Sequence, residues 1–199
     1  MDERVYSKEI VEFVTVGVEF CGWVERSAET DRRNFLLTLT RILPLLYLKA
    51  SLLPADETEE DDLLAGYVTE EQYEYLRSTM GNLLGKDDDY LEVFDADMAY
   101  SDTPIAASIS EGIADIYQDI RDLLEVYRYG NETMSRIAIS RCRENFATYW
   151  GQKLVNIMRP LHGLCYGHET EDDAEEYTAH EQEHHDCEDP HCHHHHHLS

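Results

Sequence analysis

The stretch SISEGIADIYQDIRDLLEVYRYG, residues 108–130, decides the fold. Its apolar residues recur every three or four positions, which is the period of one face of an α-helix. Ser108 with Glu111 predicts a capping box at the start, and Gly130 predicts the end. The apolar face consists of Ile109, Ile113, Ile116, Tyr117, Ile120, Leu123, Leu124 and Tyr127. The acids between them are expected to lie mostly toward water, and they are Asp115, Asp119, Asp122 and Glu125.

Two helices are predicted in the first part of the chain. Residues 7–26 carry apolar side chains at helical spacing, and Thr30 or Asp31 can cap a second helix. This second helix contains Pro44, which removes a backbone donor and crowds the preceding turn. We therefore expect one helix with a kink near residues 40–44, not two separate helices.

Two more helices complete the pattern. Thr69 with Gln72 predicts a capping box, and the helix that it begins should end at Gly85. Asn131 can cap a last helix of roughly 40 Å, at 1.5 Å per residue, that should end at Pro160. The connection at residues 130–131 is too short for anything but a near-antiparallel pair. The sequence thus predicts an all-α bundle of about five helices in residues 1–167, followed by a disordered acidic tail at residues 168–199.

Residues 86–107, KDDDYLEVFDADMAYSDTPIAA, show no sustained period. Their Asp, Ser and Pro content indicates an ordered loop between helices. A short strand at residues 91–94 fits the pattern but has no obvious partner.

The charge of the chain restricts its partners. The 199 residues carry a formal net charge of -26, which repels nucleic acid and anionic membranes. Competition with DNA for a basic protein is an alternative, although solubility explains the same charge. No apolar run is long enough to cross a bilayer, and the start MDERVYSKE does not resemble a secretory leader, so we expect a cytoplasmic protein. The five cysteines are odd in number and irregularly spaced, which argues against a disulfide framework.

Three stretches carry a family resemblance: SEGIADIYQDIRDLLEVY, FATYWGQKLVNIMRPLH and RNFLLTLTRILPLLYLKASLLP. They resemble a bacterial family known as domain of unknown function 5063, over about residues 6–162. The resemblance implies a mostly helical bacterial protein and indicates no activity. It transfers no catalytic residue, and the tail lies outside it.

The tail ends in HEQEHHDCEDPHCHHHHHLS, and ten of the eleven histidines of the chain lie at or beyond His168. Imidazole suits zinc, nickel and copper, thiolate favours zinc or cuprous copper, and carboxylates attract divalent cations. We expect labile, multiple binding of zinc or nickel, because many ligand sets are interchangeable. The candidate ligands are His180, His184, His185, Cys187, His191, Cys192, His193, His194, His195, His196 and His197.

Two other interpretations of the tail stay open. The run at residues 193–197 is similar to a purification tag, and a native tail can also be inert. Its five histidines, the following Leu198 and Ser199, and the enrichment of histidine and cysteine upstream disfavour a tag. In composition alone, the tail resembles those of nickel-handling chaperones, which suggests that it holds or delivers metal.

An alternative function is a magnesium-dependent hydrolase. TEEQYE and SEGIAD resemble the two acidic helical motifs of nucleotide pyrophosphatases of the MazG type, in which carboxylates hold magnesium against a triphosphate. The corresponding carboxylates are Glu70, Glu71, Glu74, Glu111 and Asp115. Gly112 stands where a second acid is expected. Acids in first turns also have a structural explanation, since the helix dipole favours them there.

The leading hypothesis is a protein-interaction domain with a metal-binding tail and an unknown protein partner, without nucleic acid or membrane. No phosphate-binding loop, nucleophile elbow or zinc-protease motif occurs, which lowers the expectation of an enzyme. Aromatic side chains at helical spacing are expected in the core more than at an interface: Tyr127, Tyr129, Tyr149, Trp150 and Tyr166. The cations of the last helix should pair with the chain's own carboxylates: Arg141, Arg143 and Lys153.

Overall fold

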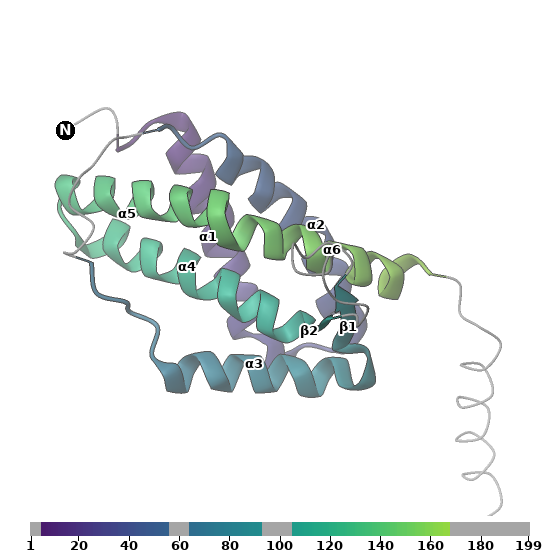
Figure 1. Cartoon of the computed structure of the whole chain (residues 1–199). Coiled ribbons are helices and arrows are strands. Elements are labelled where there is room, and N and C mark those ends of the chain that lie inside the picture. Colours follow the sequence, from purple (N-terminus) through teal and green to yellow (C-terminus); the bar gives the residue numbers. More distant parts are fainter. Residues whose placement is uncertain (1–4, 56–63, 93–104, 168–199) are drawn as a thin grey trace, which may run out of the picture. The chain divides into compact units, whose positions relative to one another are not determined.

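The helices form a bundle, as predicted. A computed structural model describes residues 5–55, 64–92 and 105–167 (Figure 1). The α-helices are α1 (Lys8–Glu25), α2 (Arg32–Ser51), α3 (Glu70–Leu84), α4 (Ile109–Tyr129), α5 (Glu132–Asn145) and α6 (Gly151–Tyr166). A π-helical turn at Phe146–Trp150 joins α5 to α6, and short 3-10 turns occupy Ser27–Glu29 and Gly85–Asp87. The predicted tail lies outside the described residues.

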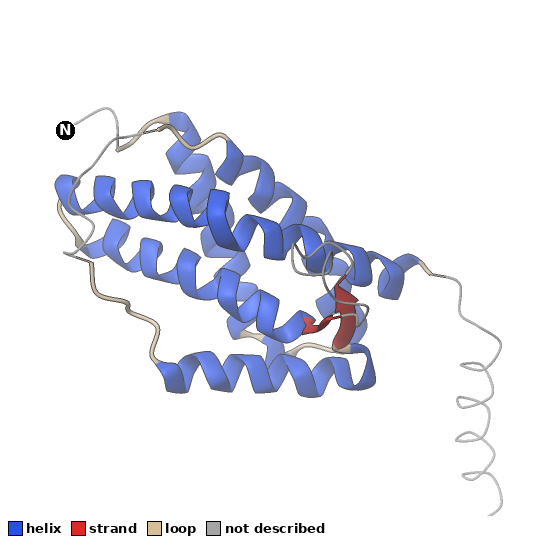
Figure 2. Ribbon diagram, in the orientation of Figure 1, coloured by secondary structure: helices blue, strands red, loops and turns tan. Residues whose placement is uncertain are grey.

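Helix α4 is the centre of the bundle. It packs against α1, α3, α5 and α6 (Figures 1 and 2). The predicted apolar face is confirmed, since seven of its members are buried and Tyr127 is half-buried. The expectation that the acids of this helix face water is wrong for Asp115, which is 9% exposed. Asp119, Asp122 and Glu125 are half-buried. A helix that is covered by four others leaves little of its circumference to solvent.

The predicted helix ends are mostly confirmed. The Thr69 hydroxyl accepts from the Gln72 N–H and the Gln72 side chain accepts from the Thr69 N–H, each at 3.2 Å. Gly85 follows α3 with a φ of 59°, a left-handed conformation that glycine adopts without a steric penalty. Asp31 caps α2 and Asn131 caps α5, through N–H donors three residues further on.

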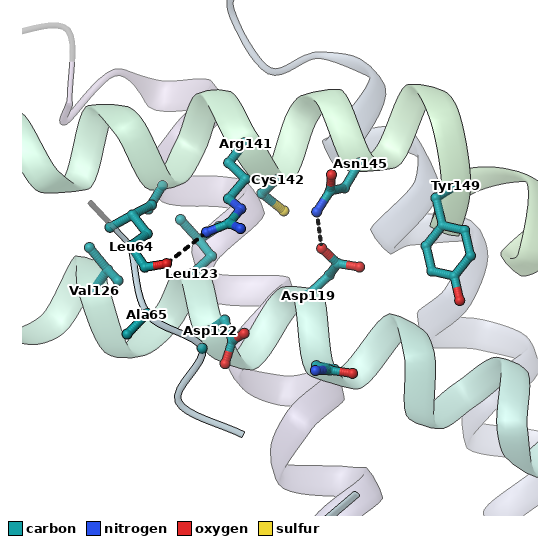
Figure 3. Close-up of a pocket in the computed structure, with 13 residues that line it drawn as sticks. Leu64, Ala65, Asp119, Asp122, Leu123, Val126, Arg141, Cys142, Asn145 and Tyr149 are labelled. Carbon is teal, nitrogen blue, oxygen red and sulfur yellow. Dashed lines mark hydrogen bonds between the residues drawn. The ribbon is translucent and has the colours of Figure 1, made fainter. Parts of the chain in front are cut away.

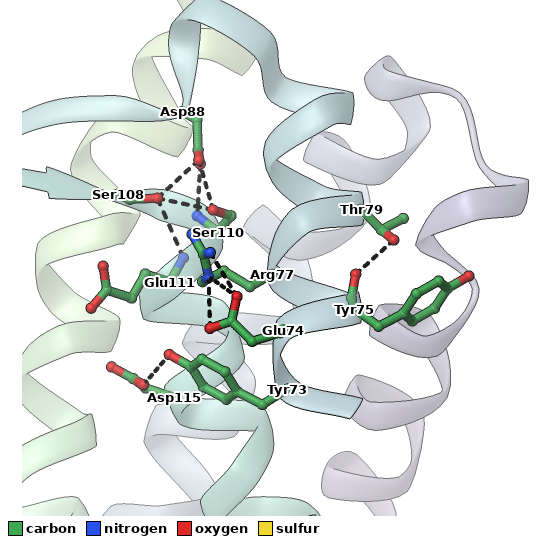
Figure 4. A network of polar contacts seen from close by, with 10 residues as sticks. All are labelled: Tyr73, Glu74, Tyr75, Arg77, Thr79, Asp88, Ser108, Ser110, Glu111 and Asp115. Carbon is green, nitrogen blue, oxygen red and sulfur yellow. Dashed lines mark hydrogen bonds and ion pairs between the residues drawn. The ribbon is translucent and has the colours of Figure 1, made fainter. Parts of the chain in front are cut away.

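The start of α4 differs from the simple capping box. The Ser108 hydroxyl accepts from the Glu111 N–H at 3.4 Å, but Asp88 also serves this end of the helix. The Asp88 carboxylate accepts from the N–H of Ser110 at 2.7 Å and from its hydroxyl at 2.6 Å (Figure 4). The anion therefore satisfies amides at the positive end of the helix dipole. Asp88 links the segment after α3 to the start of α4.

A small sheet corrects the all-α prediction. Strand β1 (Asp89–Glu92) pairs antiparallel with β2 (Ile105–Ser108), in a register that places Asp89 opposite Ser108 and Glu92 opposite Ile105 (Figure 2). The predicted loop thus contains a strand near the suspected position, and its partner lies directly before α4. Pairing over a distance in sequence leaves no local signal, which explains why the partner was missed.

The last helix is longer and less regular than expected. The prediction that it ends at Pro160 is wrong, because α6 continues to Tyr166 with Pro160 inside it. Leu161, directly after the proline, is fully buried, and α6 packs along α2. Burial of an apolar side chain stabilises by about 1.5–3 kcal/mol, which helps to offset the lost backbone hydrogen bond.

Helix α2 runs through Pro44 as a single helix, as predicted, with the proline on its exposed side. The kink there stays a prediction. Cys21 and Cys142 are buried in the core. No helix within the described ranges is both long and apolar enough to span a membrane.

Candidate polar site along helix α4

Three side chains from three different elements converge on the buried carboxylate of Asp115. Tyr73 of α3 donates its hydroxyl at 2.7 Å, and Tyr149 of the π-helical turn donates at 2.9 Å (Figure 4 shows Tyr73). Lys153 of α6 places its Nζ 2.5 Å from Asp115 Oδ2. The ammonium also lies 5.0 Å from the centre of the Tyr149 ring, within range of a cation–π contact. This Asp115 network ties α3 and α6 to the central helix.

The two phenols and the ammonium of the network stay protonated near neutral pH, because the pKa of each is raised. Burial raises the pKa of the Tyr73 hydroxyl, and the hydrogen bond to Asp115 raises it further. The same two causes raise the pKa of Tyr149. Burial alone would lower the pKa of Lys153, but Asp115 and Tyr149 outweigh it and the pKa is raised. Two phenols and an ammonium therefore donate to one carboxylate, an arrangement that suits a structural link more than proton transfer.

One turn further along α4, Asp119 lies in a different environment. Its Oδ1 accepts from the Asn145 amide of α5 at 2.5 Å (Figure 3). Burial raises the pKa of Asp119 to about 6, the Asn145 hydrogen bond opposes this, and the nearby Asp122 adds to it. The carboxylate is therefore mostly ionised at pH 7 and takes up a proton in mild acid.

A cavity of about 400 Å³ opens beside Asp119. Residues 64–66 form one wall, and α4, α5 and Tyr149 form the others (Figure 3). Asp122 holds the first wall in place, because its Oδ1 accepts from the N–H of Tyr67 at 2.7 Å and of Val68 at 2.9 Å. Arg141 donates to the carbonyl of Leu64 at 3.0 Å from the opposite side. Both contacts fix the extended segment before α3 against the α4–α5 pair.

The π-helical turn positions Tyr149 between the cavity and the Asp115 network. The N–H of Gly151 donates to the carbonyl of Phe146, five residues earlier, which is the hydrogen bond of a π-helix. A Cβ at position 151 would collide with this carbonyl oxygen, so the turn requires glycine there. π-Helical turns inside α-helices are frequent at functional sites. Gly151, inside a predicted helix, was the available signal in the sequence.

The proposed magnesium ligands do not form a metal group. Within the described ranges, which contain all five of them, no group of three or more His, Cys, Asp or Glu side chains is arranged to hold a metal ion. Glu70, Glu71 and Glu111 are exposed, and Glu74 forms an ion pair of 2.7 Å with Arg77 (Figure 4). Asp115 is occupied by its network. The helices α3 and α4 pack as that hypothesis requires, but cations lie among the carboxylates.

Gly112 gives a physical reason against the same hypothesis. It is buried where α4 meets α6, and an added Cβ would lie 2.7 Å from Ile157 Cγ2. An acid at this position would require the Ile157 side chain or α6 to move. The glycine is thus a packing residue where the nucleotide pyrophosphatase pattern expects a carboxylate.

The expectation that the five aromatic side chains lie in the core is only partly correct. Trp150 is fully buried and donates to the carbonyl of Cys142 at 3.3 Å, and Tyr127 is half-buried. Tyr129, Tyr149 and Tyr166 are 66%, 46% and 55% exposed. Tyr129 and Tyr166 are the last residues of their helices, where the neighbouring helices no longer cover them.

The predicted pairing with a carboxylate is confirmed for Lys153. Its carboxylate partner, Asp115, is buried. Arg141 donates to a backbone carbonyl, and Arg143 is exposed. His162, the histidine of the helical domain, is exposed within α6 and packs against Tyr166 at 4.9 Å between ring centres. The predicted metal ligands of the tail lie outside the described residues.

Comparison with known proteins identifies the helical domain. The chain is similar to protein BF1032 from Bacteroides fragilis, known from a crystal structure, with 42% sequence identity and a TM-score of 0.74. The similarity covers 84% of this chain and 98% of that chain. No curated protein matches the chain significantly. The family model of a domain of unknown function, DUF5063, matches residues 4–167, so the chain belongs to the DUF5063 family, as its helical motifs indicated.

Proposed function

We propose that the chain is a binding protein, whose helical domain contacts a protein partner and whose C-terminal segment binds divalent transition metal ions. One observation carries the metal assignment. The family match ends at residue 167 and α6 ends at Tyr166, and ten of the eleven histidines follow. The metal-binding residue types are thus concentrated where the helical domain stops.

The composition of residues 168–199 supports zinc or nickel as the metal. Neutral imidazoles suit both ions, and Cys187 and Cys192 add thiolates that favour zinc. The segment contains acids but no Lys or Arg, so its charge attracts divalent cations from a distance. Since five consecutive histidines offer interchangeable ligand sets, the proposed role is to hold or deliver metal and not to catalyse with it.

Exposed aromatic side chains support a partner of the helical domain. Tyr67, Tyr75 and Tyr129 are 50%, 61% and 66% exposed. Tyrosine combines a large apolar area with a polar hydroxyl and is enriched at protein interfaces. Capture of the same partner by the full chain and by residues 1–167 would place the contact on the helices, whereas capture by the full chain alone would contradict this.

Native mass spectrometry tests the metal proposal. After equilibration with zinc or nickel, the chain without any added tag should retain more than one ion, and the chain that ends at Gly167 should retain none. A full-length control with every tail histidine changed to Gln keeps the carboxylates, so it measures their separate contribution. Equal metal content of the full and shortened chains would refute the proposal.

A second variant separates a native site from a tag-like run. With residues 193–197 changed to Ser, we expect at least one ion to remain, because His180, His184, Cys187 and Cys192 are still present. Loss of all metal would place binding in the terminal run alone and contradict the proposed upstream ligands. Binding should also weaken steeply below pH about 6.5, where imidazoles protonate.

A further inference from the structure

The cavity between α4, α5 and residues 64–66 has the size of a small-molecule site. Its volume of about 400 Å³ falls in the range of pockets that bind small ligands. All of its described lining residues belong to residues 64–66, α4, α5 and Tyr149, and none of them is a proposed metal ligand. Figure 3 shows that the carboxylate of Asp119 and the amide of Asn145 face each other at this cavity.

Both acceptors and donors line the cavity, and the side-chain donors include Arg141 and Gln118. Asn145 uses its amide nitrogen on Asp119 Oδ1, which leaves the amide oxygen as an acceptor. Among the contacts of the described residues, none occupies Asp119 Oδ2, which points away from Asn145 in Figure 3. On the donor side, Arg141 already gives a hydrogen bond to Leu64. The open acceptors at Asp119 and Asn145 therefore suit a ligand that donates hydrogen bonds.

The charge of the region favours a cation. Among the described lining residues there are two carboxylates, Asp119 and Asp122, and one guanidinium, Arg141. Carboxylates that line a concave, partly desolvated surface raise the local concentration of cations.

The apolar part of the lining distinguishes an organic cation from a metal ion. Leu123, Val126 and Ala138 contribute methyl and methylene groups. These groups suit an aliphatic chain, whereas a divalent ion needs several oxygen ligands, and no group of three such side chains is found among the described residues.

We propose that this cavity binds a small aliphatic amine, such as a diamine or polyamine. One ammonium group donates to Asp119 Oδ2 and to the amide oxygen of Asn145. The methylene chain lies against Leu123 and Val126. The proposal names a ligand class for the helical domain and goes beyond the metal-binding segment and the protein partner.

Isothermal titration calorimetry of the full chain with putrescine and with spermidine tests this site. The Asp119→Asn variant removes the charge but keeps an oxygen that accepts from Asn145, so it should remain folded. Glu111→Gln is the matched control, because it removes the same charge from an exposed position on the same helix, about 12 Å away along the axis. We expect Asp119→Asn to weaken binding roughly 10-fold to 100-fold, the effect of one charged hydrogen bond, and Glu111→Gln to change it less than about twofold.

Two outcomes would overturn the proposal. Equal affinity in the native chain and both variants would mean that the amines respond to the overall negative charge and not to this cavity. Binding of Mg²⁺ that depends on Asp119, without binding of either amine, would make the site a metal site. Should Asp119→Asn unfold, as judged by circular dichroism, Asn145→Ala replaces it, and retention of full amine affinity in that variant would also refute the site.

Discussion

Asp115 and Asp119 are the same residue type one turn apart on the same helix, yet their side chains have different surroundings in the bundle. Asp115 receives an ammonium and two phenols. Asp119 receives one amide and borders a cavity. The first carboxylate is neutralised by its neighbours, and the second carries a charge that burial opposes, with a pKa raised to about 6.

The difference shows how position within a bundle separates structural acids from candidate binding acids. A buried charge is stable when partners neutralise and orient it, and it becomes available for a ligand when they do not. Asp115 lies where side chains of α3, the π-helical turn and α6 meet, whereas Asp119 faces the cavity beside residues 64–66. Substitutions at Asp115 and Asp119 should therefore change the free energy of unfolding in opposite directions.

The largest expected effect is a loss of stability in Asp115→Ala. This change leaves two phenols and one ammonium without their shared acceptor, and we expect a loss of about 2–4 kcal/mol in the free energy of unfolding. Urea denaturation monitored by circular dichroism measures it. Asp115→Asn, which keeps an acceptor oxygen, should lose less. A loss below about 1 kcal/mol in Asp115→Ala would show that the network does not stabilise the bundle.

The second largest expected effect is a gain of stability in Asp119→Asn. Asp119→Asn should gain about 1–2 kcal/mol at pH 7, because it removes a charge that burial disfavours. The folded-state pKa of Asp119 lies above its ordinary value, so its stabilising contribution is fully present below pH about 4 and is lost as the pH rises through about 6. The stability difference between variant and native chain should therefore grow between these pH values.

The charged neighbours of Asp119 also influence how the stability depends on pH. They are Asp115 and Asp122 on α4 and Arg141 on α5. Burial also raises the pKa of Asp122, so a smaller slope of the same sign should remain in the variant. An unchanged stability difference across this pH range would contradict the assignment of the raised pKa to Asp119.

The smallest expected effect is the difference in stability loss between the two phenols of the Asp115 network. Tyr149→Phe and Tyr73→Phe each remove one hydroxyl, and each should lose about 0.5–1.5 kcal/mol in the free energy of unfolding. Tyr149 is 46% exposed, so water replaces its hydrogen bond more readily and its loss should be the smaller. A larger loss for Tyr149→Phe would indicate that the π-helical turn depends on that hydroxyl.

Local features were predictable from the sequence. The caps at Asp31, Thr69 and Asn131 and the end at Gly85 depend on neighbours within a few residues. The apolar face of α4 follows from a periodicity that the same residues display. These predictions were correct because the chemistry that determines them lies within one turn of helix.

The errors concern contacts between distant segments. β2 pairs with β1, and α6 continues through Pro160 since Leu161 is buried. The candidate site was identified only in part. Asp115 was singled out for magnesium, which it is not placed to hold, and the role of Asn145 beside Asp119 was missed because a half-buried amide has no local signature.

The amino-acid sequence by itself determined the helices, most of their ends, the family and the concentration of histidine after residue 167. Periodicity, capping and composition are properties of neighbouring residues, so they are visible without a fold. Only the tertiary structure decided which acids of α4 are neutralised and which border a cavity. The charge state and accessibility of a carboxylate depend on groups that the packing of α3, α5 and α6 brings to it from elsewhere in the chain.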